Sequence, residues 1–341
     1  LMRPWIILAK KMGTCPRILA DDILLLVPGQ GMINKFASTL TLTHEYLLDM
    51  GAKIAEGKSL NVASTVAARK WLSATAWDKA GGIIKVVEHL RYLGGHLTTT
   101  SRRHHDTLTQ RGIAGQQMAA RASRLPAARH LKAAIIRVKV LSVALYGIEV
   151  ADFTEREYAT LTTAILAALT ANSSRTDVDW TFTTSSFGSG LDPEVQALTR
   201  RCMAFRRAIA KKPHMVSKYQ AIYEAYRQRN TAATIKDDFS NSQLCHLKPA
   251  PHPNVDSRST WKQGVKPKGP IGLMLQSIHS MGAALTSNLE IVQFNEVPIH
   301  LIQTPYQYLA DMVSQAAMRS RTAEANSTKA FNQGLSEIDV R

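Results

Sequence analysis

The sequence predicts an α+β fold in which a region of short strands precedes a largely helical region. Two short apolar runs flank a pair of aspartates in residues 17–27, and this pattern predicts a β-hairpin with acidic residues at its tip. Beyond residues 98–101 the composition changes to Ala, Arg and Leu at helical spacing, which predicts helices. A chain of 341 residues, 45% of them hydrophobic, is long enough for about two domains with a sizeable core.

The strand-rich region contains further elements after the hairpin. Apolar residues at near-helical spacing predict a helix over residues 31–50, and Gly51 is suited to end it. Residues 51–54 predict a turn into a short strand, and residues 82–97 predict two more short strands. We therefore expect a β-hairpin, a helix and short antiparallel strands in this region.

The helical region has two parts separated by a predicted linker. Residues 112–123 and 127–143 are predicted to form two helices, and Pro126 stands near the start of the second, where proline is tolerated. The window 172–190 is rich in Ser, Thr and Gly, which predicts a linker or an extended loop. Residues 192–229 are predicted to be helical and basic.

The C-terminal part of the chain is predicted to be mostly helical. Five prolines within residues 248–270 predict an irregular connection. Residues 271–326 mix helical patterns with short extended ones. No internal repeat is present in the sequence.

The chain carries 42 Lys and Arg residues against 26 Asp and Glu residues, a formal net charge of +16. The excess is concentrated in two stretches, because residues 102–139 contain nine basic residues and one acid, and residues 201–229 contain eight and one. A solvated helix face would also be basic. Two such stretches favour a polyanionic partner such as nucleic acid, whose phosphates release counterions when they are neutralised.

The cysteines and the apolar runs exclude two classes of protein. Cys15, Cys202 and Cys245 are odd in number and widely spaced, which fits neither a disulfide framework nor a paired zinc site. We therefore predict an intracellular location, with the nucleus as an open alternative. The longest uninterrupted apolar run, Ala164 to Leu169, has six residues, far below the roughly 18 that cross a bilayer, so the sequence predicts no membrane partner.

Adjacent aspartates at the tip of an apolar hairpin have a chemical use. The carboxylates of Asp21 and Asp22 can hold Mg²⁺, with Mn²⁺ as an alternative, and the ion takes its other ligands from water and substrate phosphates. Two metal ions in such a site can activate an attacking hydroxyl and stabilise a departing pyrophosphate. The alternative is that the two aspartates only form a turn, since Asp is a favoured turn residue.

Four short motifs follow one another within residues 17–150. They are Leu19-Ala20-Asp21-Asp22, Gly51-Ala52-Lys53-Ile54 leading to Lys58-Ser59, Tyr92-Leu93-Gly94, and Leu145-Tyr146-Gly147-Ile148-Glu149. In this order and spacing they resemble the reverse transcriptase of non-LTR (LINE-like) retrotransposons from its central palm motif onward. A weaker resemblance extends over the basic helices and residues 269–272.

The resemblance implies an RNA-directed DNA polymerase that performs two-metal nucleotidyl transfer. It implies that residues 1–98 are the C-terminal part of the palm, residues 99–170 a helical thumb, and residues 171–341 a basic C-terminal extension. The implied partners are an RNA template, a DNA primer and dNTPs, whereas the oligomeric state is left open.

The resemblance also implies roles for individual residues. Asp21 and Asp22 would be metal ligands, and Lys58 would be the general acid that protonates pyrophosphate. Tyr92, Leu93 and Gly94 would hold the primer end. The thumb residues that would grip the nucleic-acid backbone are Arg121, Arg124, Arg129, Lys132 and Arg137.

The sequence also departs from the family pattern. Leu19 stands where the family has an aromatic residue, residues 55–57 lack the Asn often found before Lys-Ser, and no aromatic residue follows Glu149. The family's first metal-binding aspartate and its template-contacting motif lie upstream of the hairpin. We therefore expect this chain to be the C-terminal part of a reverse transcriptase, inactive alone.

Two other functions are considered. The first is a non-catalytic, basic nucleic-acid-binding protein, and the second is a degenerate retroelement remnant with no selected function. A metallohydrolase has little support, because His104-His105-Asp106 and Cys245-His246 with His252 lack the spacing of metal ligands.

Overall fold

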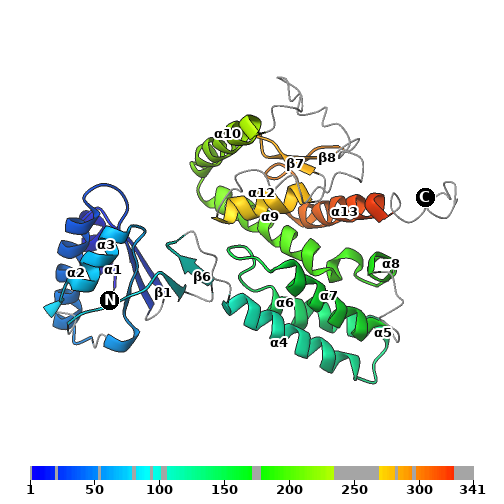
Figure 1. Ribbon diagram of the computed structural model, residues 1–341, viewed down its shortest axis with the longest axis horizontal. Coiled ribbons are helices and arrows are strands. Elements are labelled where there is room, and N and C mark those ends of the chain that lie inside the picture. The colour runs from blue at the N-terminus through cyan, green and yellow to red at the C-terminus, as the bar shows by residue number, and fades with distance from the viewer. Residues whose placement is uncertain are drawn as a thin grey trace. The chain divides into compact units, whose positions relative to one another are not determined.

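The computed structural model describes residues 2–19, 22–52, 55–78, 82–92, 95–100, 106–170, 178–233, 269–280, 283–293 and 297–325 (Figure 1). The chain divides into two compact units. The first comprises Leu1–Tyr92 and Leu97–His104, and the second comprises Leu93–His96 and His105–Arg341. Both helices and small sheets occur, in agreement with the predicted α+β class. The finer assignment to a palm, a thumb and an extension stays a prediction.

The predicted hairpin is present near the start of the first unit. β1 (Cys15–Leu19) and β2 (Asp22–Leu26) pair antiparallel, with Leu19 opposite Asp22. Two residues therefore connect the strands, and these two, Ala20 and Asp21, lie outside the described residues. Asp22 is thus the first residue of β2, at the tip of the hairpin.

Two helices, α1 (Arg3–Lys11) and α2 (Met32–Asp49), pack against one face of the hairpin. The apolar contacts come from both helices and both strands: Trp5, Ala9, Leu47, Ile18 and Leu25. Side chains alternate between the two faces of a strand. Leu19 and Asp22 therefore lie on the face of the hairpin that points away from the helices.

The helix predicted over residues 31–50 is confirmed by α2, and Gly51 ends it as predicted. Gly51 has a φ of 73°, a left-handed conformation that glycine adopts without steric cost. The N–H group of Gly51 donates to the Leu48 carbonyl at 2.8 Å, and that of Ala52 donates to the Leu47 carbonyl at 2.9 Å. This pair of hydrogen bonds is a Schellman motif, which satisfies the last carbonyls of the helix.

Short strands complete the first unit. β3 (Leu60–Asn61) and β4 (Lys85–Val86) pair in parallel, so the prediction of only antiparallel strands is wrong here. Parallel strands need a crossover connection, and α3 (Val66–Ala74) lies within that connection. A further pair, β5 (His89–Tyr92) and β6 (Gly95–Thr98), follows along the chain.

A second small apolar cluster joins α2 to α3. Its buried members are Leu40, Leu72, Trp77 and Ile84. The ring of Trp77 makes edge-to-face contacts with Phe36 at 5.5 Å and with Trp71 at 5.7 Å between ring centroids, a favourable aromatic geometry. The core of the first unit is therefore divided between two small clusters.

From residue 106 the second unit continues with helices, as predicted. α4 (Asp106–Ser123) is followed by a helical segment made of α5 (Arg129–Ile135), η3 (Ile136–Val140) and α6 (Leu141–Ala144). η3 is a π-helical turn between two α-helical pieces. α7 (Glu155–Leu169) and α6 both pack against α4.

The segment predicted as a linker or extended loop over residues 172–190 is partly helical, so the prediction is wrong for its described part. α8 (Val178–Thr183) and η5 (Gly188–Leu191) lie there, and the first residues of the window lie outside the described part. Phe182 and Leu191 are fully buried in the apolar cluster that α4 to α7 form. These two apolar side chains dock a segment whose Ser, Thr and Gly content predicts a loop.

The helical character predicted for residues 192–229 is confirmed by α9 (Pro193–Lys211) and α10 (Met215–Ala233). Asp192 caps α9, since its Oδ1 accepts hydrogen bonds from two backbone N–H groups of the first turn at 2.8 and 3.1 Å. The irregular connection predicted over residues 248–270 lies outside the described residues, apart from its last two, which begin a helix.

The last elements are α12 (Gly269–Ser280), β7 (Ala283–Leu285), β8 (Glu290–Gln293), β9 (Ile299–His300) and α13 (Tyr306–Ala325). They confirm the mixed pattern predicted for this end of the chain. The strands form one antiparallel sheet in the order β7-β8-β9. α9 lies against α12 and α13 (Figure 1). None of the described helices is long and apolar enough to cross a membrane.

Candidate nucleic-acid interface

Asp22 presents its carboxylate at the tip of the hairpin. The side chain is exposed and makes no hydrogen bond or ion pair with any of the described residues. The hairpin below it is held by Ile18 and Leu25, which pack against Trp5 and its neighbours. The oxygens of Asp22 are therefore available to a cation or to solvent.

Carboxylate oxygens are the ligands that Mg²⁺ prefers, so Asp22 fits this ion chemically. Its sequence neighbour Asp21 lies outside the described residues. Within the described parts of the chain, no three His, Cys, Asp or Glu side chains gather closely enough to hold a metal ion. Asp22 is therefore one ligand, and further oxygens would have to come from Asp21, substrate or water.

Two more predicted site residues lie in the first unit. Lys58 is the exposed last residue of η1 (Glu56–Lys58), and its N–H group donates to the Ala55 carbonyl at 3.0 Å. Tyr92 is the half-buried last residue of β5, whereas its motif partners Leu93 and Gly94 lie outside the described residues. No hydrogen bond between the described side chains joins Asp22, Lys58 and Tyr92 to one another.

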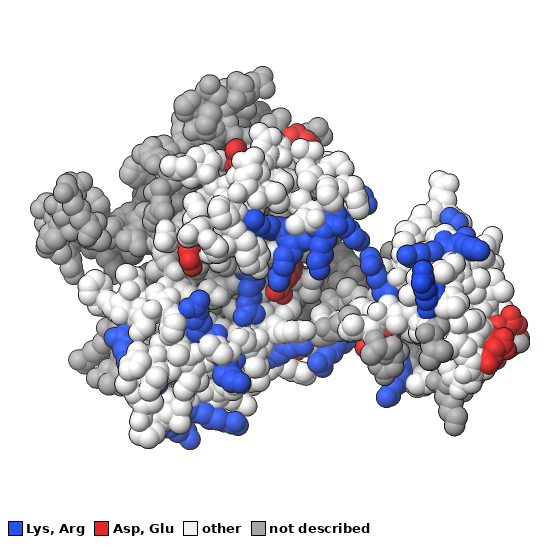
Figure 2. Space-filling model, turned by 180° about the vertical axis from the view of Figure 1, so that it is seen from behind, with Lys and Arg blue, Asp and Glu red and all other residues white. Residues whose placement is uncertain are grey.

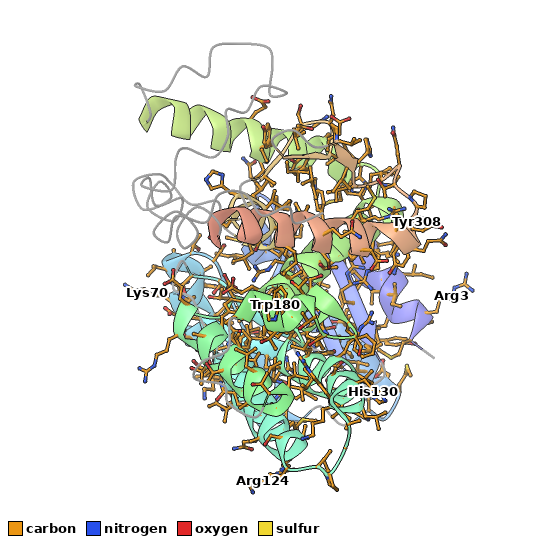
Figure 3. All side chains as sticks on the ribbon, turned by 90° about the vertical axis from the view of Figure 1, so that its right-hand side faces the viewer. Arg3, Lys70, Arg124, His130, Trp180 and Tyr308 are labelled. Atoms are coloured by element: carbon orange, nitrogen blue, oxygen red, sulfur yellow. The ribbon has the colours of Figure 1, made fainter. Side chains whose placement is uncertain are left out.

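Arg121 and Arg124 lie at the C-terminal end of α4 and in the turn after it. Both are exposed, and neither guanidinium group donates a hydrogen bond to a described residue. Figure 3 shows the side chain of Arg124 pointing away from the helices. Of the five predicted thumb residues, these two have guanidinium groups that make no hydrogen bond or ring contact with a described residue, so all of their donors can contact a phosphate.

The other three predicted thumb residues make contacts within the protein. Lys132 donates from Nζ to the carbonyl of Ser123 at 2.7 Å, at the C-terminal end of α4, where a cation is favourable. Arg129 donates to the Thr181 carbonyl at 3.3 Å. The guanidinium carbon of Arg137 lies 4.9 Å from the centre of the Phe187 ring, within cation–π distance.

An exposed aromatic residue beside these arginines was not predicted. Trp180 of α8 has 69% of its surface exposed, and the next residue, Thr181, accepts the hydrogen bond from Arg129. Its window has the composition of a loop, so the sequence holds no helical signal there. The only sequence feature that could have identified Trp180 as a candidate site residue is that it is a tryptophan in a largely polar window.

The second basic stretch contains arginines that hold the fold together. Arg201 is buried and donates to the carbonyls of Ile148 and Ala151, both at 3.1 Å, and to Asp152 at 2.7 Å. Arg200, which was not predicted, donates to the carbonyls of Leu141 and Leu145. The carbonyls of Leu141 and Leu145 also accept the backbone N–H groups of Leu145 and Ile148, so Arg200 adds a second hydrogen bond to each.

The ion pair of Asp152 and Arg201 belongs to a larger buried network. The hydroxyl of Tyr158 donates to Asp152 at 3.0 Å, and Arg201 also donates to Ser277 of α12. Burial raises the pKa of Tyr158 well above its ordinary value, so its hydroxyl keeps the proton that it donates. The network joins the segment before α7 to α9 and α12.

The fourth motif, residues 145–149, is a turn that is anchored by two buried side chains and held by arginines. Leu145 and Ile148 are fully buried, and Gly147 has a φ of 88°. Arg111 of α4 donates to the Tyr146 carbonyl at 2.6 Å and lies over the Tyr146 ring at 4.6 Å. This segment therefore positions helices of the second unit relative to one another.

Exposed positive charge remains on the second unit after these contacts are counted. Figure 2 shows Lys and Arg side chains spread over the face of this unit in view, with few Asp and Glu among them. Among the residues of the second basic stretch whose side chains the structure describes, the exposed ones are Arg207, Lys211, Lys212 and Lys218. A surface of this kind attracts polyanions.

Comparisons of the chain with protein-family models, with curated proteins and with solved structures found no match. The function must therefore be argued from the residues described above. Those residues divide into an exposed acidic hairpin tip in the first unit and a basic surface in the second unit.

Proposed function

We propose that this chain is the C-terminal part of an RNA-directed DNA polymerase of the non-LTR (LINE-like) retrotransposon type. The observation that supports the proposal most is the β1–β2 hairpin. Asp22, the first residue of β2, lies at the tip of this hairpin and is exposed there without a protein partner among the described residues, and Asp21 precedes it in the sequence. An acidic pair of this kind suits Mg²⁺ or Mn²⁺ and the phosphates of a dNTP.

The reaction proposed is attack of the primer 3′-hydroxyl on the α-phosphate of a dNTP, which forms a phosphodiester and releases pyrophosphate. Asp21 and Asp22 would hold Mg²⁺ or Mn²⁺, and these ions would supply activation of the hydroxyl and stabilisation of the leaving group. The ammonium group of Lys58 stabilises the departing pyrophosphate and can protonate it. Tyr92, Leu93 and Gly94 hold the primer end.

Polymerisation is expected to need more than this chain. The resemblance begins at the Asp-Asp motif, whereas the family's first metal-binding aspartate belongs to an earlier part of the palm. A site with only two of three carboxylates holds its metals poorly. We therefore expect the chain alone to be inactive and to become active when joined to the upstream part of the polymerase.

Primer extension on an RNA template with Mg²⁺ and dNTPs tests this function. The chain is assayed alone and joined to the segment encoded upstream, each with and without Asp22→Asn. Extension is expected only from the joined protein and is lost in Asp22→Asn. Asp49→Asn, an exposed aspartate at the end of α2, is the matched control and should keep activity. A joined Asp22→Asn protein that extends as well as its parent contradicts the proposal.

A non-catalytic nucleic-acid-binding function is the second candidate, and the exposure of Arg121 and Arg124 favours it. Its measurement is the affinity for duplex as a function of salt. Each contacted phosphate contributes about 0.9 to the slope of log affinity against log salt, so Arg124→Ala should lower that slope by about 0.9. Arg156→Ala, exposed on α7, is the control that should leave it unchanged. A flat salt response contradicts nucleic-acid binding altogether.

A further inference from the structure

The side chain of Trp180 is held outward by a well-docked helix. It is 69% exposed, whereas the next two residues, Thr181 and Phe182, are buried. Figure 3 shows Trp180 on α8. Leaving a large aromatic ring in water forgoes the free energy of burying it. An exposed Trp on a helix that is fixed in this way is therefore a feature that needs an explanation.

Two arginines flank the segment that carries Trp180. Arg129 donates from Nη2 both to the Thr181 carbonyl at 3.3 Å and to the Ser185 hydroxyl at 3.2 Å. Arg137 lies over the ring of Phe187 at 4.9 Å. Both arginines are exposed. Their contacts fix their guanidinium groups, and an arginine has five N–H donors, so donors remain for a ligand.

We use the name Trp180 surface for Trp180 and Phe187 of this segment together with the two arginines that contact the segment, Arg129 and Arg137. It combines an exposed ring with fixed cations, which is the combination that proteins use to bind single-stranded nucleic acid. A base stacks on the ring and the neighbouring phosphates contact the cations. Bases in a duplex are already stacked on one another, so the ring gives an advantage to unpaired bases alone.

The charge of the Trp180 surface argues against an apolar protein partner. The described polar groups on this segment are the Thr184 hydroxyl, which donates to the Trp180 carbonyl, and the Ser185 hydroxyl, which accepts from Arg129; hydroxyl and guanidinium groups suit phosphates. We propose that the Trp180 surface binds single-stranded nucleic acid, with an unpaired base stacked on Trp180 and adjacent phosphates on Arg129 and Arg137. This inference rests on the proposed function in that the chain binds nucleic acid, and it adds a preference for unpaired strands.

The test compares affinities for a labelled single-stranded RNA, the matching single-stranded DNA and the corresponding duplex, by fluorescence anisotropy with the full chain. Trp180→Ala is expected to weaken single-strand binding about tenfold and to change duplex binding less than about twofold. Trp180→Phe keeps a ring and should retain most of the affinity. Tyr308→Ala, which removes a ring that is 55% exposed on α13 (Figure 3), is the matched control and should change neither.

Different outcomes separate this inference from the function on which it rests. If Trp180→Ala binds single strands as tightly as the parent, or if it weakens the binding of single strands and of duplex equally, the proposal for the Trp180 surface is wrong. Salt-dependent binding and primer extension can then still be found. If primer extension fails but the Trp180-dependent preference for single strands is found, only the polymerase proposal falls. If the chain binds no nucleic acid at low salt, both fall.

Discussion

The two units differ in how they treat the polar groups that they bury. In the described residues, the buried side-chain atoms without a hydrogen-bond partner are the indole nitrogens of Trp5 and Trp77, Oγ1 of Thr39 and Nδ2 of Asn61, all in the first unit. The second unit buries an arginine, Arg201, and surrounds it with acceptors. A buried polar group without a partner costs about 1–3 kcal/mol, so the first unit carries a penalty that the second avoids.

The apolar cores differ in the same direction. The first unit has two separate clusters of four and three buried residues, whereas each of the two clusters of the second unit contains many more. Hydrophobic stabilisation scales with the apolar area removed from water. The residues that resemble catalytic motifs therefore lie mainly in the unit with the smaller apolar clusters, which we expect to be the less stable one. Hydrogen exchange should therefore find lower opening free energies in the first unit.

The largest expected effect is loss of the buried arginine of the second unit. Arg201→Ala leaves the Asp152 carboxylate without its ion-pair partner and should lower the free energy of unfolding by about 3–5 kcal/mol. Hydrogen exchange resolved by peptide should show this loss in the second unit while the first unit stays unchanged.

Arg207→Ala is the matched control for this variant, because Arg207 is exposed on the same helix. Its effect should stay within about 0.5 kcal/mol. Arg201→Lys should not restore stability, since an ammonium group cannot reproduce the planar fork of donors. An Arg201→Ala protein with parental hydrogen-exchange rates would contradict the conclusion that the contacts of Arg201 stabilise the second unit.

A smaller effect, of opposite sign, is expected in the first unit. Thr39→Val removes a buried hydroxyl that has no partner and should raise the free energy of unfolding by about 1 kcal/mol. Thr43→Val is the matched variant, because the Thr43 hydroxyl donates to the Thr39 carbonyl at 2.7 Å. It should lower stability by about 1 kcal/mol. Urea unfolding in which both variants shift in the same direction would contradict this account.

The smallest effect concerns pH and the first unit. Burial lowers the pKa of His44 below its ordinary value of 6.5, although a hydrogen bond to the Leu40 carbonyl opposes the shift. The unfolded chain therefore takes up this proton more readily than the folded chain. The contribution to stability is complete above pH 6.5 and is lost as the pH falls from 6.5 toward the folded pKa.

Thermal unfolding at pH 8 and at pH 5.5 checks this expectation. His44→Gln should reduce the acid-dependent loss of stability in the first unit. His130→Gln, which changes an exposed histidine of the second unit (Figure 3), should leave that loss in place. A His44→Gln protein with the parental pH dependence would show that another group is responsible.

Local patterns predicted those elements whose signals lie within a few residues. The hairpin followed from apolar runs around two aspartates, and the end of α2 followed from Gly51. The helical docking of the window 172–190 was not predictable, because Phe182 and Leu191 are buried by residues distant in sequence. The parallel pairing of β3 with β4 was missed for the same reason, since it depends on a crossover.

Charge was the least predictable property of the candidate site. The sequence shows two basic stretches but cannot tell Arg124, which is exposed, from Arg201, which is buried on carbonyls and a carboxylate. The partners of Arg201 lie about fifty residues earlier in the chain or on a later helix, so no local pattern identifies them. The candidate hairpin tip was predictable because it is local, and the Trp180 surface was not, because it joins two distant segments.

The π-helical turn η3 between α5 and α6 has a consequence for the length of the chain. Such a turn contains one residue more than an α-helical turn. Ile136, the first residue of η3, and Leu141, which directly follows η3, are both buried. Deleting the exposed Val138, which is 62% exposed, would return the segment to α-helical geometry with both buried faces in phase. The same deletion within α4 would rotate every later residue of that helix by about 100°. Within these helices, η3 is therefore the position at which a homologous chain could be one residue shorter without losing its core.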